Sequence, residues 1–158
     1  MRNLKNAIAI ALPEAIFLQA TSNEGQTEGD IAEMGYRLSQ EILQYIRENC
    51  PGNQLARITI IGYSMGGVIA RAALPYLDRF KDKFHGFVSL CSPHLGYMYK
   101  TSKLFSTGMW ILNKWKKSTA ITQLRMADGR SIEDCYLYKL SQVQGLGWFK
   151  HMMLVSSY

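Results

Sequence analysis

The sequence has little of several features that would point to a particular class of protein. Its 158 residues include only 3 cysteines, with no Cys-x-x-Cys pair and no histidine at metal-ligand spacing, which argues against a disulfide framework and a zinc site. No run approaches the ~18 apolar residues of a membrane-spanning helix. Repeats and low-complexity segments are also lacking. We therefore expect one compact domain over residues 1–158 in a reduced, cytoplasmic setting.

Basic residues outnumber acidic ones and give a formal net charge of +6. They are scattered except between Lys100 and Lys117, and no nucleic-acid-binding motif accompanies them. We interpret this charge as a local surface feature and expect no nucleic-acid partner. Since the sequence also has no phosphate-binding loop, we expect neither a metal nor a nucleotide nor an organic cofactor.

The first twenty residues allow two interpretations. Arg2 and Lys5 precede the apolar run 7–12, a pattern that superficially resembles a secretory signal. Pro13 interrupts this run, and a helix that ends before Pro13, followed by a strand over 15–19, explains the same residues. We favour the helix and strand, and the signal peptide is the alternative.

Apolar periodicity predicts strands that alternate with helices along the rest of the chain. Asp30 and Glu33 form a capping pair for a helix that runs to about Asn49. The remaining predicted elements are strands at 57–61, 85–91 and 152–157 and helices at 67–74 and 131–142. The alternation indicates an α/β fold with a mainly parallel sheet flanked by helices, a class in which ligands bind at the carboxyl ends of the strands.

Residues 62–66, which read Gly-Tyr-Ser-Met-Gly, are the most informative part of the sequence. A β-branched strand precedes them and a helix of small residues follows, and this pattern is typical of a nucleophile elbow. In such an elbow a strained backbone presents the serine, here Ser64, for attack. We expect Gly62, Gly66 and Gly67 to let the strand and helix approach closely. The alternative, a chance match, explains neither the strand nor the helix.

A Ser-Pro-His-Leu-Gly loop at 92–96 follows the strand predicted at 85–91. Because the carboxyl ends of parallel strands meet at one edge of a sheet, we expect this loop beside Ser64. His94 is the only histidine expected at that edge, and it is therefore the best internal candidate for a base. The expected binding residues are Tyr63, His94, Leu95 and Gly96.

The other two histidines, His85 and His151, stand at the beginnings of predicted strands. That position is the opposite edge of a parallel sheet, roughly 20 Å from Ser64. The chain order of Ser64, then Asp128 or Asp134, then His151 imitates the order of a hydrolase triad. The expected geometry nevertheless argues against this triad.

The elbow, the Ser-Pro-His-Leu-Gly loop and the Leu-Val-Ser-Ser segment at 154–157 resemble the lipase-like putative serine esterase family of the α/β-hydrolase superfamily. The resemblance covers nearly the whole chain. It implies that Ser64 is a nucleophile and that the backbone N–H of Met65 is one half of an oxyanion hole. It also gives His94 a supporting role, with a loop-ordering hydrogen bond favoured over proton transfer. The implied substrate is a carboxylic ester or a lipid acyl group.

In that family a strand ending in His-Gly precedes the first helix seen here, and the catalytic acid and histidine follow the last strand. We therefore expect this chain to be the central part of a domain, with impaired catalysis on its own, because a serine hydroxyl without a base is a weak nucleophile. A catalytically silent module that binds an acyl group or a partner is the alternative.

The resemblance also implies a helical cap over residues 97–127. Within it, apolar residues share one helical face and lysines the other, and Trp110 falls on the basic face. An exposed tryptophan among lysines fits a lipid surface, so peripheral membrane contact is one interpretation. An amphipathic helix packed on the body of the protein is the other. The sequence does not define an oligomeric state.

Overall fold

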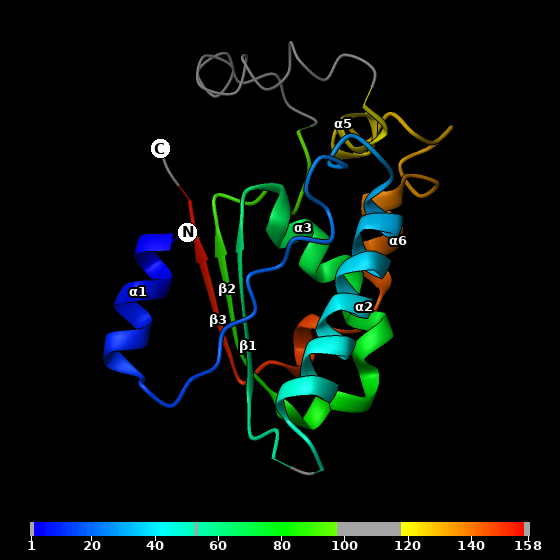
Figure 1. Ribbon diagram of the computed structural model, residues 1–158. Helices are drawn as coiled ribbons and strands as arrows, with labels where there is room; N and C mark the ends of the chain where they lie inside the picture. The colour runs from blue at the N-terminus through cyan, green and yellow to red at the C-terminus, as the bar shows by residue number, and fades with distance from the viewer. Residues whose placement is uncertain (1, 53, 98–117, 157–158) are drawn as a thin grey trace.

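The computed structural model describes residues 2–52, 54–97 and 118–156. They form a three-stranded parallel sheet with helices around it (Figure 1), which confirms the predicted α/β class. The elements in chain order are α1 (Arg2–Ala11), α2 (Ile31–Asn49), β1 (Ile58–Tyr63), α3 (Met65–Ala73), η1 (Leu74–Lys83), β2 (Phe84–Leu90), α5 (Thr119–Leu124), α6 (Tyr136–Gln142), η2 (Leu146–Trp148) and β3 (His151–Val155). The cap expected at 97–127 falls mostly on 98–117, which lie outside the described residues.

The strands follow the order β1-β2-β3, with β2 in the middle. Tyr63 is in register with Leu90, and Leu90 with Val155, so the three strands end at one edge of the sheet. Figure 1 shows α1 on one side of the strands and α2, α3 and α6 on the other. The turn after β1 and the loop after β2 therefore leave the sheet side by side.

Helix α2 begins where its capping sequence predicts. Asp30 Oδ1 accepts hydrogen bonds from Ala32 N at 2.7 Å and Glu33 N at 3.3 Å, which satisfies two of the free N–H groups of the first turn. Helix α2 then packs closely on α3, because a Cβ at Gly35 would lie 2.5 Å from Ala72 Cβ. The missing side chain at position 35 is what allows the two helices to approach.

The hydrophobic core has two parts. One lies among α2, α3, α5 and α6, and the other lies between the sheet, α3, η1 and the segment around η2. The largest fully buried side chains are Phe84, Phe87, Ile31, Met34, Leu74 and Leu77. Helix α3 contributes to both parts, so its position is fixed from two sides. None of the described helices is long and apolar enough to cross a membrane.

Two predicted elements differ from the structure. The strand predicted at 15–19 is wrong, since residues 15–20 have no regular secondary structure and pair with none of the described strands. These residues and β1 line a common groove, and no backbone hydrogen bond joins the two described segments. The helix predicted at 131–142 begins only at Tyr136, whose N–H donates to Asp128 Oδ2 at 2.8 Å.

Strand β3 is an exposed hydrophobic edge. Leu154 is 63 % exposed and Met153 is 58 % exposed, and no described strand covers the outer edge. Such an edge is a template for pairing with another chain.

We expect Leu154→Lys to lower the self-association of the 158-residue chain severalfold, as measured by sedimentation velocity and light scattering. Equal self-association in this variant and in the control Ile132→Lys, which replaces an exposed side chain elsewhere, would contradict a role for β3.

Candidate active site

Ser64 occupies the tight turn between β1 and α3. Its backbone has φ 52° and ψ −130°, a conformation that costs a residue with a side chain roughly 1–3 kcal/mol. The N–H of Ser64 donates to Leu90 O at 2.8 Å, which ties the turn to the end of β2. The Ser64 side chain makes no capping hydrogen bond to α3. Gly67 N donates to Ser64 O at 3.2 Å, so the first N–H groups left for another acceptor beside the serine hydroxyl are those of Met65 and Gly66.

Two of the three glycines around Ser64 make the close contacts. A Cβ at Gly62 would lie 2.5 Å from Gly67 Cα and 2.6 Å from Gly67 N, so strand β1 and the first turn of α3 touch through their backbones. A Cβ at Gly67 would lie 2.2 Å from Ser92 Oγ. A Cβ at Gly66 would meet no atom within 4 Å. The close approach expected at Gly66 is therefore made by Gly67 instead.

The loop after β2 lies at the same edge of the sheet as Ser64. Its first residue, Cys91, has φ 53° and donates its N–H to Val155 O at 2.7 Å. Gly96 has φ 71°, and a Cβ there would lie 2.4 Å from Leu124 O. Leu95 is 88 % exposed, whereas His94 and Gly96 are partly buried. The loop is thus fastened to β3 and to the end of α5, with Leu95 facing solvent.

His94 turns both ring nitrogens into the protein. Its Nε2 lies 2.8 Å from Ser89 Oγ, at hydrogen-bonding distance, while Nδ1 is buried and has no hydrogen-bond partner among the described residues. Burial, and then the positive charge of Arg71, lower the pKa of His94 to about 4. The imidazole is consequently neutral near pH 7 and has no hydrogen bond to Ser64.

The remaining histidines lie far from Ser64. The rings of His85 and His151 are in contact, with centroids 4.9 Å apart, at the amino ends of β2 and β3. Leu90 lies five positions after His85 in β2, roughly 17 Å along the strand. Asp128 and Asp134 bond locally before α6, to Tyr136 N and Ser131 Oγ. The structure therefore does not assemble the triad suggested by chain order.

Within the described ranges, no three His, Cys, Asp or Glu side chains are grouped to hold a metal ion.

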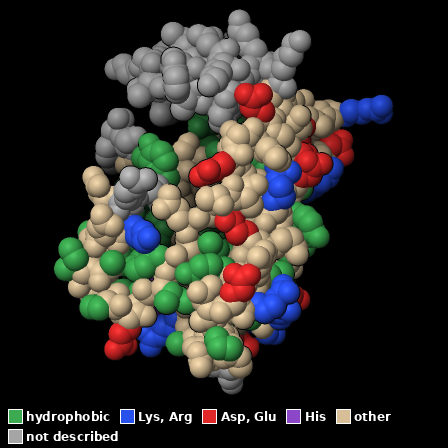
Figure 2. All heavy atoms as spheres, viewed as in Figure 1, with side chains coloured by type: hydrophobic (Ala, Val, Ile, Leu, Met, Phe, Trp, Pro, Cys, Tyr) green, Lys and Arg blue, Asp and Glu red, His purple; other side chains and the backbone are tan. Residues whose placement is uncertain are grey.

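A groove of about 640 Å³ runs along the outer edge of β1. Its walls are β1, residues 16–20, and side chains of α1 and α2, most of them hydrophobic. Figure 2 shows hydrophobic side chains exposed on this face of the molecule. Gly62, Tyr63 and Gly66 line one end of the groove, which therefore reaches the turn that carries Ser64. Tyr63 itself is 59 % exposed.

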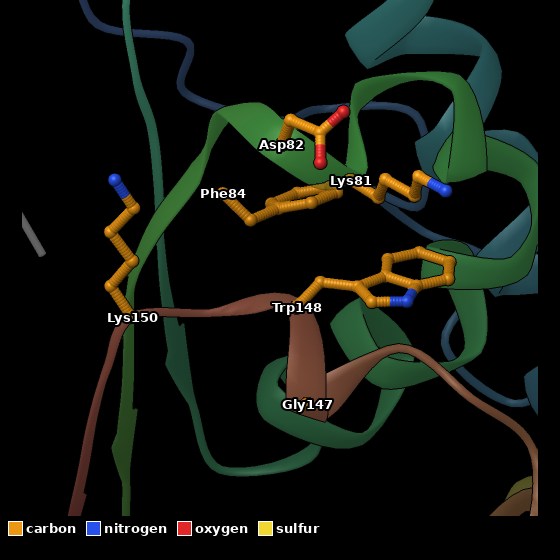
Figure 3. Close-up of a pocket in the computed structure, with 6 residues that line it drawn as sticks. All are labelled: Lys81, Asp82, Phe84, Gly147, Trp148 and Lys150. Carbon is orange, nitrogen blue, oxygen red and sulfur yellow. The ribbon is translucent and has the colours of Figure 1, made fainter.

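A second cavity, of about 450 Å³, lies at the opposite end of the sheet. Trp148 and Phe84 stack across it, with ring centroids 5.9 Å apart. Figure 3 shows that the ammonium groups of Lys81 and Lys150 point away from one another. The charged groups do not converge on a common point, and the cavity is remote from Ser64, so we do not assign it to the site.

The sequence analysis missed Ser89 and Arg71. Ser89 is buried in β2 against His94, and Arg71 Nη1 donates to His94 O at 3.3 Å. A hydroxyl inside a strand that is otherwise apolar was the available signal, because a buried polar group requires a partner. The single arginine within the small-residue helix α3 was a similar signal.

The arrangement defines a protein class: a parallel α/β sheet whose carboxyl edge carries a serine in a strained strand-to-helix turn. Comparison with family models is in agreement, since the model for the family described as "Putative serine esterase (DUF676)" matches residues 1–158. The chain belongs to this family. No solved structure matches the chain.

Proposed function

We propose that this chain carries the nucleophile of a serine hydrolase that acts on carboxylic esters, lipid acyl esters among them. The observation that carries the proposal is the strained turn that places Ser64 beside the uncapped start of α3. Membership of the serine esterase family supports an ester as the substrate. The proposed fold is the central part of an α/β-hydrolase domain, with residues 97–127 forming its cap.

In the proposed reaction, Ser64 Oγ attacks the ester carbonyl carbon and passes its proton to a base. The backbone N–H of Met65 stabilises the negative oxygen of the tetrahedral intermediate. The protonated base then gives its proton to the departing oxygen as the ester C–O bond breaks, which releases the alcohol and leaves an acyl group on Ser64. Water, deprotonated by the same base, attacks this acyl group, and the carboxylic acid and the free serine hydroxyl are released. The chemistry requires a base within hydrogen-bonding reach of Ser64.

The position of that base distinguishes two candidate functions. All three histidines are among the described residues, and none of them is hydrogen-bonded to Ser64. We propose that the base and the acid come from a segment outside residues 1–158. The same observation favours a second candidate, a catalytically silent module that uses the elbow region for binding.

Covalent labelling with a fluorophosphonate, read as intact mass, tests the proposal. In the natural full-length polypeptide we expect stoichiometric labelling that Ser64→Ala abolishes. The 158-residue chain alone should react at least roughly a hundredfold more slowly, which is the usual contribution of a general base. A folded full-length protein that is not labelled would support the silent module. Rapid labelling of the 158-residue chain would place the base within it.

A further inference from the structure

A small group of buried and partly buried polar side chains lies beneath the first turn of α3. Ser89 is 2 % exposed, and its Oγ lies 2.8 Å from His94 Nε2. The carbonyl oxygen of His94 accepts a hydrogen bond from Arg71, which projects from α3. The imidazole is therefore held by Ser89 of strand β2, and the backbone of His94 is held by Arg71 of helix α3.

The same group is in direct contact with the turn that follows Ser64. A Cβ at Gly67 would lie 2.2 Å from Ser92 Oγ and 3.0 Å from Ser89 Oγ, so the backbone of α3 rests on these two hydroxyl groups. Gly67 N in turn donates to Ser64 O at 3.2 Å. A movement of the 92–94 segment would consequently displace the first turn of α3 and, with it, the N–H of Met65.

We propose that His94 is a positioning residue for Ser64, acting through Ser89, Ser92 and Gly67 on the first turn of α3. This inference rests on the proposed function, because it concerns the placement of the Met65 N–H toward a reacting carbonyl. His94 does not itself touch the substrate. Its contribution is to fix the distance between the sheet and the start of the helix.

The alternative role, a general base, is at odds with the contacts of the ring. Nε2 is engaged by Ser89, and Nδ1 is buried without a hydrogen-bond partner among the described residues. The pKa of about 4 keeps the ring neutral and makes it a poor proton acceptor at neutral pH. A neutral ring also avoids a second positive charge next to Arg71.

Substitution of His94 by glutamine and by alanine separates these roles. The terminal amide of glutamine can reach the position of Nε2 and bond to Ser89, but it cannot act as a base. In the natural full-length polypeptide, we expect His94→Gln to keep the maximal fluorophosphonate labelling rate within about threefold. His94→Ala should lower that rate roughly ten- to a hundredfold with unchanged inhibitor affinity, since small displacements of a reacting geometry cost that much.

Matched variants serve as controls. Ser89→Ala should reproduce the loss seen in His94→Ala, and it tests the proposal if His94→Ala does not fold. His151→Gln replaces an exposed histidine at the opposite end of the sheet and should leave the rate unchanged. Equal losses in His94→Gln and His94→Ala would overturn the proposal in favour of a base. Wild-type rates in both would overturn any role in positioning.

A readout that needs no reaction distinguishes failure of the inference from failure of the proposed function. The amide resonances of Met65, Gly66 and Gly67 in a ¹H–¹⁵N spectrum should shift in His94→Ala and stay in place in His94→Gln. If the resonances behave in this way in a protein that no fluorophosphonate labels, the positioning role of His94 is supported and the proposed hydrolase activity is wrong. If they do not shift in His94→Ala, the positioning role is wrong.

Discussion

Gly62→Ala is expected to lower the free energy of unfolding by about 3 kcal/mol or more, whereas Gly66→Ala should leave it unchanged or raise it by up to about 1 kcal/mol. The two glycines flank Ser64 symmetrically in the sequence but not in space. A Cβ at position 62 would lie 2.5 Å from Gly67 Cα, a backbone atom that cannot rotate away. A Cβ at position 66 would meet no atom within 4 Å, in a helix where alanine is preferred.

Urea unfolding followed by circular dichroism measures both changes. Fluorophosphonate labelling of the same variants in the full-length protein reports on the site, and we expect Gly62→Ala to lose labelling because the turn at Ser64 must shift. Gly66→Ala is the matched control, since it makes the same chemical change in the same motif. Equal destabilisation by the two variants would contradict the backbone contact between β1 and α3.

Gln123→Leu is expected to lower the free energy of unfolding by about 2–4 kcal/mol. Gln123 is 4 % exposed; its Oε1 accepts a hydrogen bond from Ile31 N at 2.9 Å, and its Nε2 donates to Asp30 Oδ2 at 2.7 Å. Leucine has a similar volume but satisfies neither group. The substitution would leave the N–H of Ile31 buried without a partner and loosen the cap of α2.

The matched control for this variant is Gln144→Leu, which changes an exposed glutamine and should alter stability by less than about 0.5 kcal/mol. Thermal unfolding and amide hydrogen exchange at Ile31 measure the effect. Exchange should accelerate at the start of α2 in Gln123→Leu only. If both variants unfold like the wild type, the hydrogen bonds of Gln123 do not anchor α2.

Local patterns predicted most of the elements because their causes are local. Helix α2 was predicted from its capping pair and apolar stripe, and the three strands from short apolar runs. The strand predicted at 15–19 did not form, because a β-strand requires hydrogen bonds to an adjacent strand. Residues 16–20 instead line a groove together with β1. The predicted start of α6 was too early, because residues 131–135 form bends and turns and the helix begins at Tyr136, whose N–H donates to the distant Asp128.

The sequence predicted those features of the candidate site that follow from local patterns and from the strand order, but not its long-range contacts. The position of Ser64, and its proximity to the loop after β2, follow from the rule that parallel strands end at one edge of a sheet. The contacts of Gln123 with Asp30 and Ile31 join residues more than 90 positions apart, and no local pattern encodes them. The contact of α3 with Ser89 and Ser92 likewise depends on how the helix packs against the sheet, which no local pattern encodes.

The sheet order β1-β2-β3 repeats the order of the strands in the chain, and this has a consequence for folding. Twenty residues, 64–83, connect β1 to β2, whereas sixty, 91–150, connect β2 to β3. Closing the longer connection costs about 1 kcal/mol more in chain entropy. We infer that β1, α3 and β2 come together first and that β3 joins them later. Ser64, Ser89 and the tie between Ser64 N and Leu90 O all belong to the earlier unit. The geometry around the serine would then be set near the beginning of folding, before the sheet is complete.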